Sequence, residues 1–314
     1  KQMARMERVT GSHPGIDRID EILEVGVMSD GTLVAEVHRT WSDGLMHVAE
    51  EPGIAHAPQT GPDALIEFLY FNPDTMLEVG NHARFYRDFV NSDVSNARRE
   101  FNVYLPPSYF TDIELKYPTV FHLHGAGGNN QLSEVVDIDQ QVERLINESF
   151  IKEMIVVMPS GRSVDDQDTW YTNSSVEQWR TMFLTELLPQ VVTNYRTIDD
   201  RTARGIGGWS MGGHGAFTSA WEAQDKFGSI ASLAGALSLP PLAGSPADLA
   251  ANSADTPIIQ VNYRDPLFLR SYCYLLYAGE DDDFAFDEAA RIMMVELAAK
   301  TVIVQAEIKP NGQH

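Results

Sequence analysis

The chain has 314 residues, 43% of them hydrophobic, which is enough to bury the core of one large α/β domain or two ordinary ones. Its 23 basic and 45 acidic residues give a formal net charge of −22, which repels nucleic acid and anionic membrane surfaces. The single cysteine, Cys273, excludes an internal disulfide and a Cys-based zinc site. Because Cys273 lies in an apolar run, we expect a buried, unreactive thiol.

The sequence contains no run of about 18 apolar residues, so we expect no membrane-spanning helix. The chain begins Lys1-Gln2-Met3 rather than with an initiator methionine. We expect that a signal peptide or another leader has been removed, which favours a secreted or periplasmic protein over a cytoplasmic one.

Residues 1–80 contain few apolar runs. Two of them, at 32–37 and 64–71, predict short strands, or one strand and one helix. A segment with so little to bury is marginal as an independent domain, so we interpret it as an N-terminal extension packed on the main body. Four histidines in this segment lack metal-ligand spacing: His13, His38, His47 and His56.

Residues 81–314 alternate between predicted strands and helices. The strands are expected at 83–90, 100–105, 117–124, 154–159, 202–209, 227–233, 272–278 and 302–308. The helices are expected at 132–148, 176–195 with an interruption near Pro189, 211–224 and 287–300; residues 236–270 have no clear period and indicate a crossover or cap region. This alternation predicts an α/β domain with a mostly parallel sheet covered by helices on both faces.

The central motif is Gly208-Trp209-Ser210-Met211-Gly212, a G-x-S-x-G pattern between a predicted strand and a predicted helix. This pattern is typical of a sharp turn that lifts a nucleophilic serine clear of the sheet. Glycines flank the serine because a Cβ at either position would clash as the chain folds back. The N–H of Met211, in the first turn of the helix, would point at the reacting carbonyl oxygen.

An activated serine needs a base, and the base needs an orienting acid. The histidines after Ser210 are His214, one helical turn behind it, and His314, which follows the last predicted strand; position favours His314. The acid is expected in the loop after the preceding strand, where four carboxylates stand in a row: Glu280, Asp281, Asp282 and Asp283. Periodicity does not choose among them.

A second oxyanion donor is expected from the loop Gly125-Ala126-Gly127-Gly128, which follows the strand at 117–124. Its glycines let the backbone approach a ligand, and Ala126 offers an N–H without a bulky side chain. The loop lacks the Lys-Ser/Thr ending of a phosphate-binding loop, which disfavours that alternative.

Together the motifs resemble the esterase D / feruloyl esterase family of the α/β-hydrolases. The resemblance rests on VYLPPSY at 103–109, Leu123-His124-Gly125, Leu187-Leu188-Pro189 and GWSMGG at 208–213 followed by Gly215-Ala216, and it extends from about residue 81 to the end. The family also includes acetyl-xylan esterases, siderophore esterases, mycolyltransferases and S-formylglutathione hydrolases. Residues 1–80 match nothing in the family.

The resemblance implies Ser210 as nucleophile, Ala126 as second oxyanion amide, and the histidine of the late Gly-x-His as base, which is His314. The family's Gly-x-x-Asp motif falls on Gly279 to Asp282, which favours Asp282 as the acid. Family members continue past this histidine, so we expect the full-length protein to extend beyond it.

Three further residues are candidates for substrate contact: Trp209, Trp170 and Gly125. Trp209 either lines the acyl pocket or packs under the elbow. The aspartates just before Trp170, at 165, 166 and 168, lack the spacing of a calcium loop and are interpreted as a solvated turn. His122 and His124 are interpreted as structural imidazoles on a buried strand.

The resulting hypothesis is a serine carboxylesterase that acts through an acyl-enzyme on a small-molecule or oligosaccharide ester, with no metal or organic cofactor. The resemblance implies a carbohydrate-linked feruloyl or acetyl ester. The alternatives are a thioesterase or siderophore esterase, or an esterase-like protein that binds a partner or glycan without catalysis. The cysteine-containing oxyanion loop of the S-formylglutathione hydrolases is absent from 125–128, which makes an oxygen ester the preferred substrate.

Overall fold

The computed structural model describes residues 18–27, 33–41, 65–71, 78–79, 85–110, 112–130 and 138–314. The chain divides into two compact units, Lys1–Arg87 and Asp88–His314. Within the described ranges, no helix has both the length and the apolar character needed to cross a membrane.

The described residues of the first unit include the strands β1 (Arg18–Val27), β2 (Leu33–Trp41), β3 (Leu65–Phe71) and β4 (Glu78–Val79). Consecutive strands pair antiparallel, with a register shift in β1 between Ile22 and Glu24. The strands predicted near 32–37 and 64–71 are confirmed, and the helix alternative for one of them is wrong. Of the four histidines in this segment, three lie outside the described residues: His13, His47 and His56.

The second unit is built on a sheet with the strand order β5-β6-β8-β7-β9-β10-β11-β12. The bounds are β5 (Phe85–Ser92), β6 (Ala97–Tyr104), β7 (Thr119–Leu123), β8 (Ile155–Pro159), β9 (Arg204–Trp209), β10 (Ser229–Leu233), β11 (Cys273–Gly279) and β12 (Val304–Lys309). From β8 to β12 all neighbours pair parallel, whereas β6 pairs antiparallel with β8. The mostly parallel sheet predicted from the sequence is confirmed.

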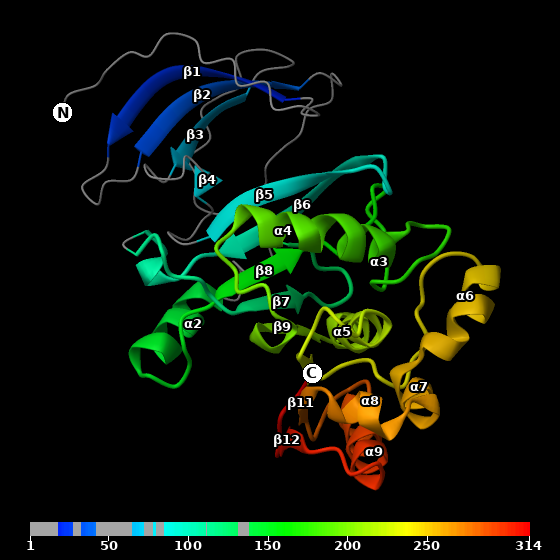
Figure 1. The fold of residues 1–314 in the computed structure, drawn as a ribbon. Helices are drawn as coiled ribbons and strands as arrows, with labels where there is room; N and C mark the ends of the chain where they lie inside the picture. The colour runs from blue at the N-terminus through cyan, green and yellow to red at the C-terminus, as the bar shows by residue number, and fades with distance from the viewer. Residues whose placement is uncertain are drawn as a thin grey trace. The chain divides into compact units, whose positions relative to one another are not determined.

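Helices connect these strands (Figure 1). Their bounds are α2 (Ile138–Asn147), α3 (Trp179–Met182), α4 (Leu188–Asn194), α5 (Met211–Glu222), α6 (Pro246–Asn252), α7 (Pro257–Tyr263), α8 (Pro266–Arg270) and α9 (Phe286–Ala299). In the strand order of the sheet, the connection from β7 to β8 leads toward β6, whereas every later connection leads toward β12. Right-handed crossovers therefore place α2 on one face and α3, α4, α5 and α9 on the other.

Two details differ from the sequence prediction. The helix expected at 176–195 is three pieces, because a π-helical turn, Phe183–Leu187, separates α3 from α4 just before Pro189. The region 236–270 contains the short helices α6, α7 and α8. Each begins with a proline after Ser, Thr or Asp, a start signal that periodicity alone does not reveal.

Aromatic side chains fill the core between the sheet and the helices. Phe121 of β7 lies edge-on to Phe183 at 5.4 Å and to Phe227 at 6.0 Å between ring centroids, and Trp179 stacks on Phe183 at 4.9 Å. All four side chains are fully buried, and each contributes roughly 2–3 kcal/mol of hydrophobic stabilisation. This packing joins β7 to the helical segment that contains Trp179 and Phe183.

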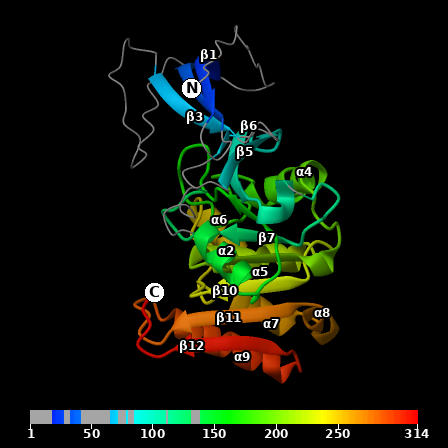
Figure 2. The same ribbon diagram turned by 90° about the vertical axis from the view of Figure 1, so that its left-hand side faces the viewer.

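The carboxyl ends of the parallel strands meet at one edge of the sheet. Ser210 follows β9, His124 follows β7, Asp282 lies three residues after β11, and His314 lies five residues after β12. Figure 2 shows the carboxyl end of β11 beside the C-terminus. In open α/β sheets this edge is where ligands bind.

Candidate active site

The turn at Ser210 is strained. The residue has φ 56° and ψ −117°, a backbone conformation that L-residues rarely adopt. A Cβ on Gly208 or on Gly212 would overlap the carbonyl oxygen of Leu123, at the end of β7. Glycine is therefore required on both sides of the serine, as the sequence motif predicted, and the turn presents Ser210 at the edge of the sheet.

An acid–imidazole pair lies at the same edge. Nδ1 of His314 donates a hydrogen bond to Oδ2 of Asp282 at 2.8 Å. The Asp282 side chain is fully buried, and its Oδ1 accepts the N–H groups of Phe284 at 2.8 Å and Phe286 at 3.4 Å. Asp281 and Asp283 are exposed. Among the neighbouring aspartates it is thus Asp282 that orients an imidazole.

Backbone contacts hold the two loops of this pair together. The N–H of Asp281 donates to the carbonyl of Gly312 at 2.8 Å, and the N–H of Glu280 donates to the carbonyl of Lys309 at 2.9 Å. A Cβ on Gly279 would overlap the backbone of Gly312, so the loops touch without side chains between them. This close approach fixes the position of the terminal histidine relative to the acid.

Aromatic rings surround His314. The ring centroids of Trp209 and Phe284 lie 4.9 Å from that of His314, and that of Phe286 lies 5.2 Å away. Trp209 immediately precedes Ser210, so the packing brings the imidazole next to the elbow. Within the described part of the chain no hydrogen bond joins the Ser210 hydroxyl to His314, and the proton-transfer contact itself stays a prediction.

The expected oxyanion donors also meet at the elbow. A Cβ on Gly125 would lie 2.8 Å from the Trp209 ring and 3.3 Å from Cβ of Ser210, so the loop passes directly over the serine. Across the described residues, the N–H groups of Ala126 and Met211 have no hydrogen-bond acceptor. Met211 occupies the first position of α5, where an intrahelical acceptor does not exist. Both N–H groups are thus available to an anionic oxygen.

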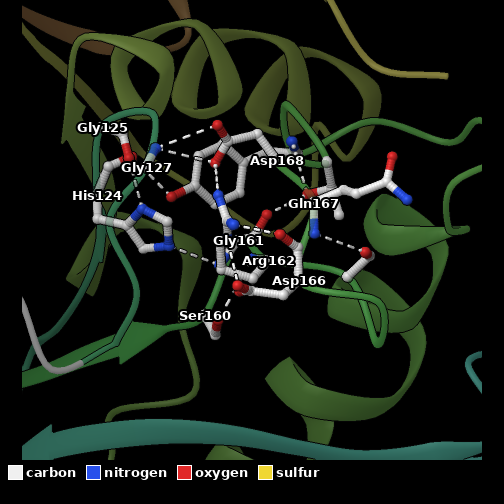
Figure 3. A network of polar contacts seen from close by, with 12 residues as sticks. His124, Gly125, Gly127, Ser160, Gly161, Arg162, Asp166, Gln167 and Asp168 are labelled. Carbon is white, nitrogen blue, oxygen red and sulfur yellow. Dashed lines mark hydrogen bonds and ion pairs between the residues drawn. The ribbon is translucent and has the colours of Figure 1, made fainter. Parts of the chain in front are cut away.

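Sequence reasoning missed the segment that holds this loop in place (Figure 3). Both carboxylate oxygens of Asp168 accept the N–H of Gly127 at 3.1 Å, and Arg162 donates to Asp168 at 2.9 Å. The solvated-turn interpretation is therefore wrong for Asp168. Arg162 also donates to Asp166 at 2.8 Å, and this bond lowers the pKa of the Asp166 carboxyl.

His124 is a structural imidazole, as predicted. Its Nε2 accepts the N–H of Gly161 at 2.7 Å, so the ring proton is on Nδ1, which donates to the carbonyl of Gly125 at 2.7 Å. The hydroxyl of Tyr171 donates to the carbonyl of His124 at 2.8 Å. Burial lowers the pKa of His124 and raises that of Tyr171, which keeps both groups neutral.

His214 lies in the core of the domain. It is fully buried on α5, its Nδ1 lies 3.4 Å from the carbonyl of Ala236, and burial lowers its pKa to about 4. Trp170 is also buried and packs edge-on against His214 at 5.6 Å, so a contact between Trp170 and substrate stays a prediction. The position of His214 agrees with its exclusion as the base.

Two further outcomes concern metal ligands and the cysteine. Among the residues that the structure describes, no cluster of three or more His, Cys, Asp or Glu side chains could hold a metal ion.

Cys273 is exposed, and the expectation of a buried thiol is wrong. Cys273 begins β11, in which exposed and buried side chains alternate, so its apolar neighbours Tyr274 and Leu276 point to the opposite face.

A strained serine after a parallel strand, with a hydrogen-bonded acid–imidazole pair at the same edge, defines the α/β-hydrolase class. A family model described as "Putative esterase" matches residues 92–291. The chain belongs to this esterase family.

Several known proteins are similar to the chain. Esterase Rv1288 of Mycobacterium tuberculosis is 32% identical over 143 residues, which cover 44% of this chain and 29% of the relative. An endo-1,4-beta-xylanase/feruloyl esterase of Xylanibacter ruminicola is 27% identical over 164 residues, which cover 51% and 23%. The matches thus span less than a third of the length of these two curated relatives.

Solved structures share the fold. A ferulic acid esterase superposes with a TM-score of 0.67 and 27% identity, covering 74% of this chain and 91% of that one. An S-formylglutathione hydrolase from Agrobacterium tumefaciens superposes with a TM-score of 0.55 at 19% identity, covering 73% of this chain and 88% of that one.

Proposed function

We propose that the protein is a serine-dependent carboxylic ester hydrolase. The proposal rests on one observation: the strained Ser210 and the hydrogen-bonded pair of Asp282 and His314 lie at the same edge of the sheet. Because Nδ1 of His314 donates to a fully buried carboxylate, Nε2 carries the lone pair that a general base needs.

The reaction proceeds in two halves. Oγ of Ser210 attacks the ester carbonyl carbon while Nε2 of His314 takes the hydroxyl proton. The tetrahedral intermediate collapses, the C–O bond to the alcohol breaks, and His314 gives the proton to the leaving oxygen. In the second half, Nε2 of His314 takes a proton from a water molecule while the water attacks the acyl carbon. The bond to Oγ then breaks, His314 returns the proton to Ser210, and the carboxylic acid is released.

Two backbone amides stabilise the anionic oxygen of each intermediate, those of Met211 and Ala126. Each such donor accounts for roughly 10²–10³ in rate where one has been removed from a related site. Asp282 holds the imidazole in the required tautomer and stabilises its charge when it becomes protonated. None of these steps requires a metal or organic cofactor.

The proposed substrate is a carbohydrate-linked feruloyl or acetyl ester. The names of two relatives support it, a ferulic acid esterase and a xylanase/feruloyl esterase. The site adds aromatic side chains, because Phe284, which is 64% exposed, and Trp209 both lie 4.9 Å from the His314 ring between centroids. We propose that Trp209, Trp170 and Gly125 contribute to the acyl pocket.

The test is hydrolysis of p-nitrophenyl acetate by the wild-type chain and by Ser210→Ala. We expect a burst of p-nitrophenol equal to the enzyme concentration in the wild type and its loss in the variant. An unchanged rate in Ser210→Ala would reject this serine as nucleophile. Ethyl ferulate, acetylated xylan and S-formylglutathione, assayed in parallel, separate the proposed substrate from the thioester alternative.

A further inference from the structure

The loop that carries the proposed oxyanion donor Ala126 is held by side chains of a different connection, the one after β8. The N–H of Gly127 donates to both carboxylate oxygens of Asp168 at 3.1 Å. These residues are 41 positions apart in the sequence, and Gly127 has φ 76°, a conformation that glycine adopts without strain. The contact therefore belongs to the tertiary structure and not to a local turn.

We infer that Asp168, paired with Arg162, forms a clamp that positions the Ala126 N–H for the oxyanion. The inference rests on the proposed function. The peptide plane that contains the Ala126 N–H also contains the carbonyl of Gly125, which accepts from His124 Nδ1 at 2.7 Å and from the N–H of Gly128 at 3.2 Å. The next plane is fixed by Asp168, so both planes around Ala126 are constrained.

The second component of the clamp is its charge. A carboxylate next to an oxyanion site opposes the negative charge that develops there. Arg162 offsets the charge of Asp168, because its Nη1 donates to Asp168 at 2.9 Å. Its Nε also donates at 2.8 Å to Asp166, whose side chain is 86% exposed to solvent. The pair is partly shielded from solvent, with the Arg162 side chain 20% exposed and that of Asp168 26% exposed, so solvent screens part of their attraction.

Arg162 is itself fixed from several sides. Its Nη2 donates to the carbonyl of Asp166, and its own carbonyl accepts a hydrogen bond from the guanidinium of Arg99. Arg99 is buried and pairs with the buried Glu177 at 3.2 Å. The clamp is thus anchored to the interior of the domain rather than to a loose surface loop.

The test compares four variants with p-nitrophenyl acetate as substrate and phenylboronic acid as inhibitor. Phenylboronic acid forms a tetrahedral, anionic adduct with an active-site serine, so its affinity depends on the groups that stabilise the anionic oxygen. The variants are Asp168→Ala, Arg162→Gln, the double variant Arg162→Gln/Asp168→Asn, and the control Asp165→Asn, whose exposed side chain lies in the same loop.

We expect Asp168→Ala to lower kcat about tenfold to a hundredfold with KM changed less than about threefold, because the donor matters in the transition state. The affinity for phenylboronic acid falls by a similar factor. Arg162→Gln, which leaves the carboxylate unpaired, lowers kcat about tenfold. Adding Asp168→Asn to it restores part of the rate, since the amide oxygen still accepts the Gly127 N–H without the charge. Asp165→Asn keeps wild-type values.

If Asp168 and Arg162 only stabilised the fold, their substitution would lower stability, and the losses of kcat in the two single variants would multiply in the double variant. That result would overturn the inference. Wild-type kcat and phenylboronic acid affinity in Asp168→Ala, with Ser210→Ala inactive, would overturn it as well while leaving the proposed function intact. Activity that persists in Ser210→Ala would instead reject the proposed function itself. Thermal unfolding of each variant confirms that folded protein is compared.

Discussion

Replacing Asp282 by asparagine is the most informative substitution, because the structure determines how the new amide must sit. Oδ1 of Asp282 accepts two backbone N–H groups, and Oδ2 accepts Nδ1–H of His314. The asparagine keeps the backbone bonds only if its oxygen replaces Oδ1, which turns its NH₂ group toward His314. The opposite orientation places two donors face to face in a fully buried position, at a cost of about 1–3 kcal/mol.

An NH₂ group facing Nδ1 of His314 makes that nitrogen the acceptor, so the ring proton moves to Nε2. Nε2 then cannot take the proton of Ser210. We expect kcat for p-nitrophenyl acetate to fall about 10³–10⁴-fold, or about 4–5.5 kcal/mol in transition-state stabilisation, with KM little changed.

The matched controls are Asp281→Asn and Asp283→Asn. Both side chains are exposed, so we expect wild-type kcat in each. The reasoning is refuted if Asp282→Asn keeps more than about a tenth of kcat, or if either control falls as far. Circular dichroism and thermal unfolding of all three variants exclude a loss of fold as the cause.

Three further predictions concern stability and exposure. Gly212→Ala places a methyl group against the Leu123 carbonyl and should lower the free energy of unfolding, measured in urea, by about 3 kcal/mol or more. The control Gly205→Ala, whose methyl group would have no neighbour closer than 3.7 Å, should change it by about 1 kcal/mol or less. Equal effects of the two substitutions would contradict the close approach of Gly212 to Leu123. Burial lowers the pKa of His214 from 6.5 to about 4. Between these two pH values the unfolded chain binds a proton that the folded chain does not, so the protein loses stability as the pH decreases. His214 should lower the free energy of unfolding by about 2 kcal/mol when the pH decreases from 7 to 5, and His214→Met should abolish this loss. The prediction is rejected if the free energies of unfolding of the wild type and of His214→Met depend on pH in the same way. Ellman's reagent should label exposed Cys273 in the folded protein without loss of activity, and an unreactive thiol would contradict its exposure.

The sequence predicted the sheet well because buried parallel strands are continuous apolar runs between turn residues. It predicted the elbow because glycine is needed wherever a Cβ would overlap a carbonyl, as at Gly208 and Gly212. The helices α6, α7 and α8 were missed since each has seven residues or fewer, too short for a hydrophobic period to show.

Features that depend on tertiary contacts could not be predicted in this way. Asp281, Asp282 and Asp283 are chemically identical, and only burial and the approach of His314 distinguish them. The family motif identified Asp282, whereas residue patterns alone did not. Asp168 resembled any solvated aspartate because its partner, the Gly127 N–H, comes from a distant loop.

The most direct test of the account is covalent labelling with a fluorophosphonate, which phosphonylates an activated serine with loss of fluoride. Intact mass spectrometry and peptide mapping should find one adduct per chain, on the peptide that contains Ser210, and none in Ser210→Ala. An adduct on another residue, or hydrolysis that continues in Ser210→Ala at the wild-type rate, would contradict it.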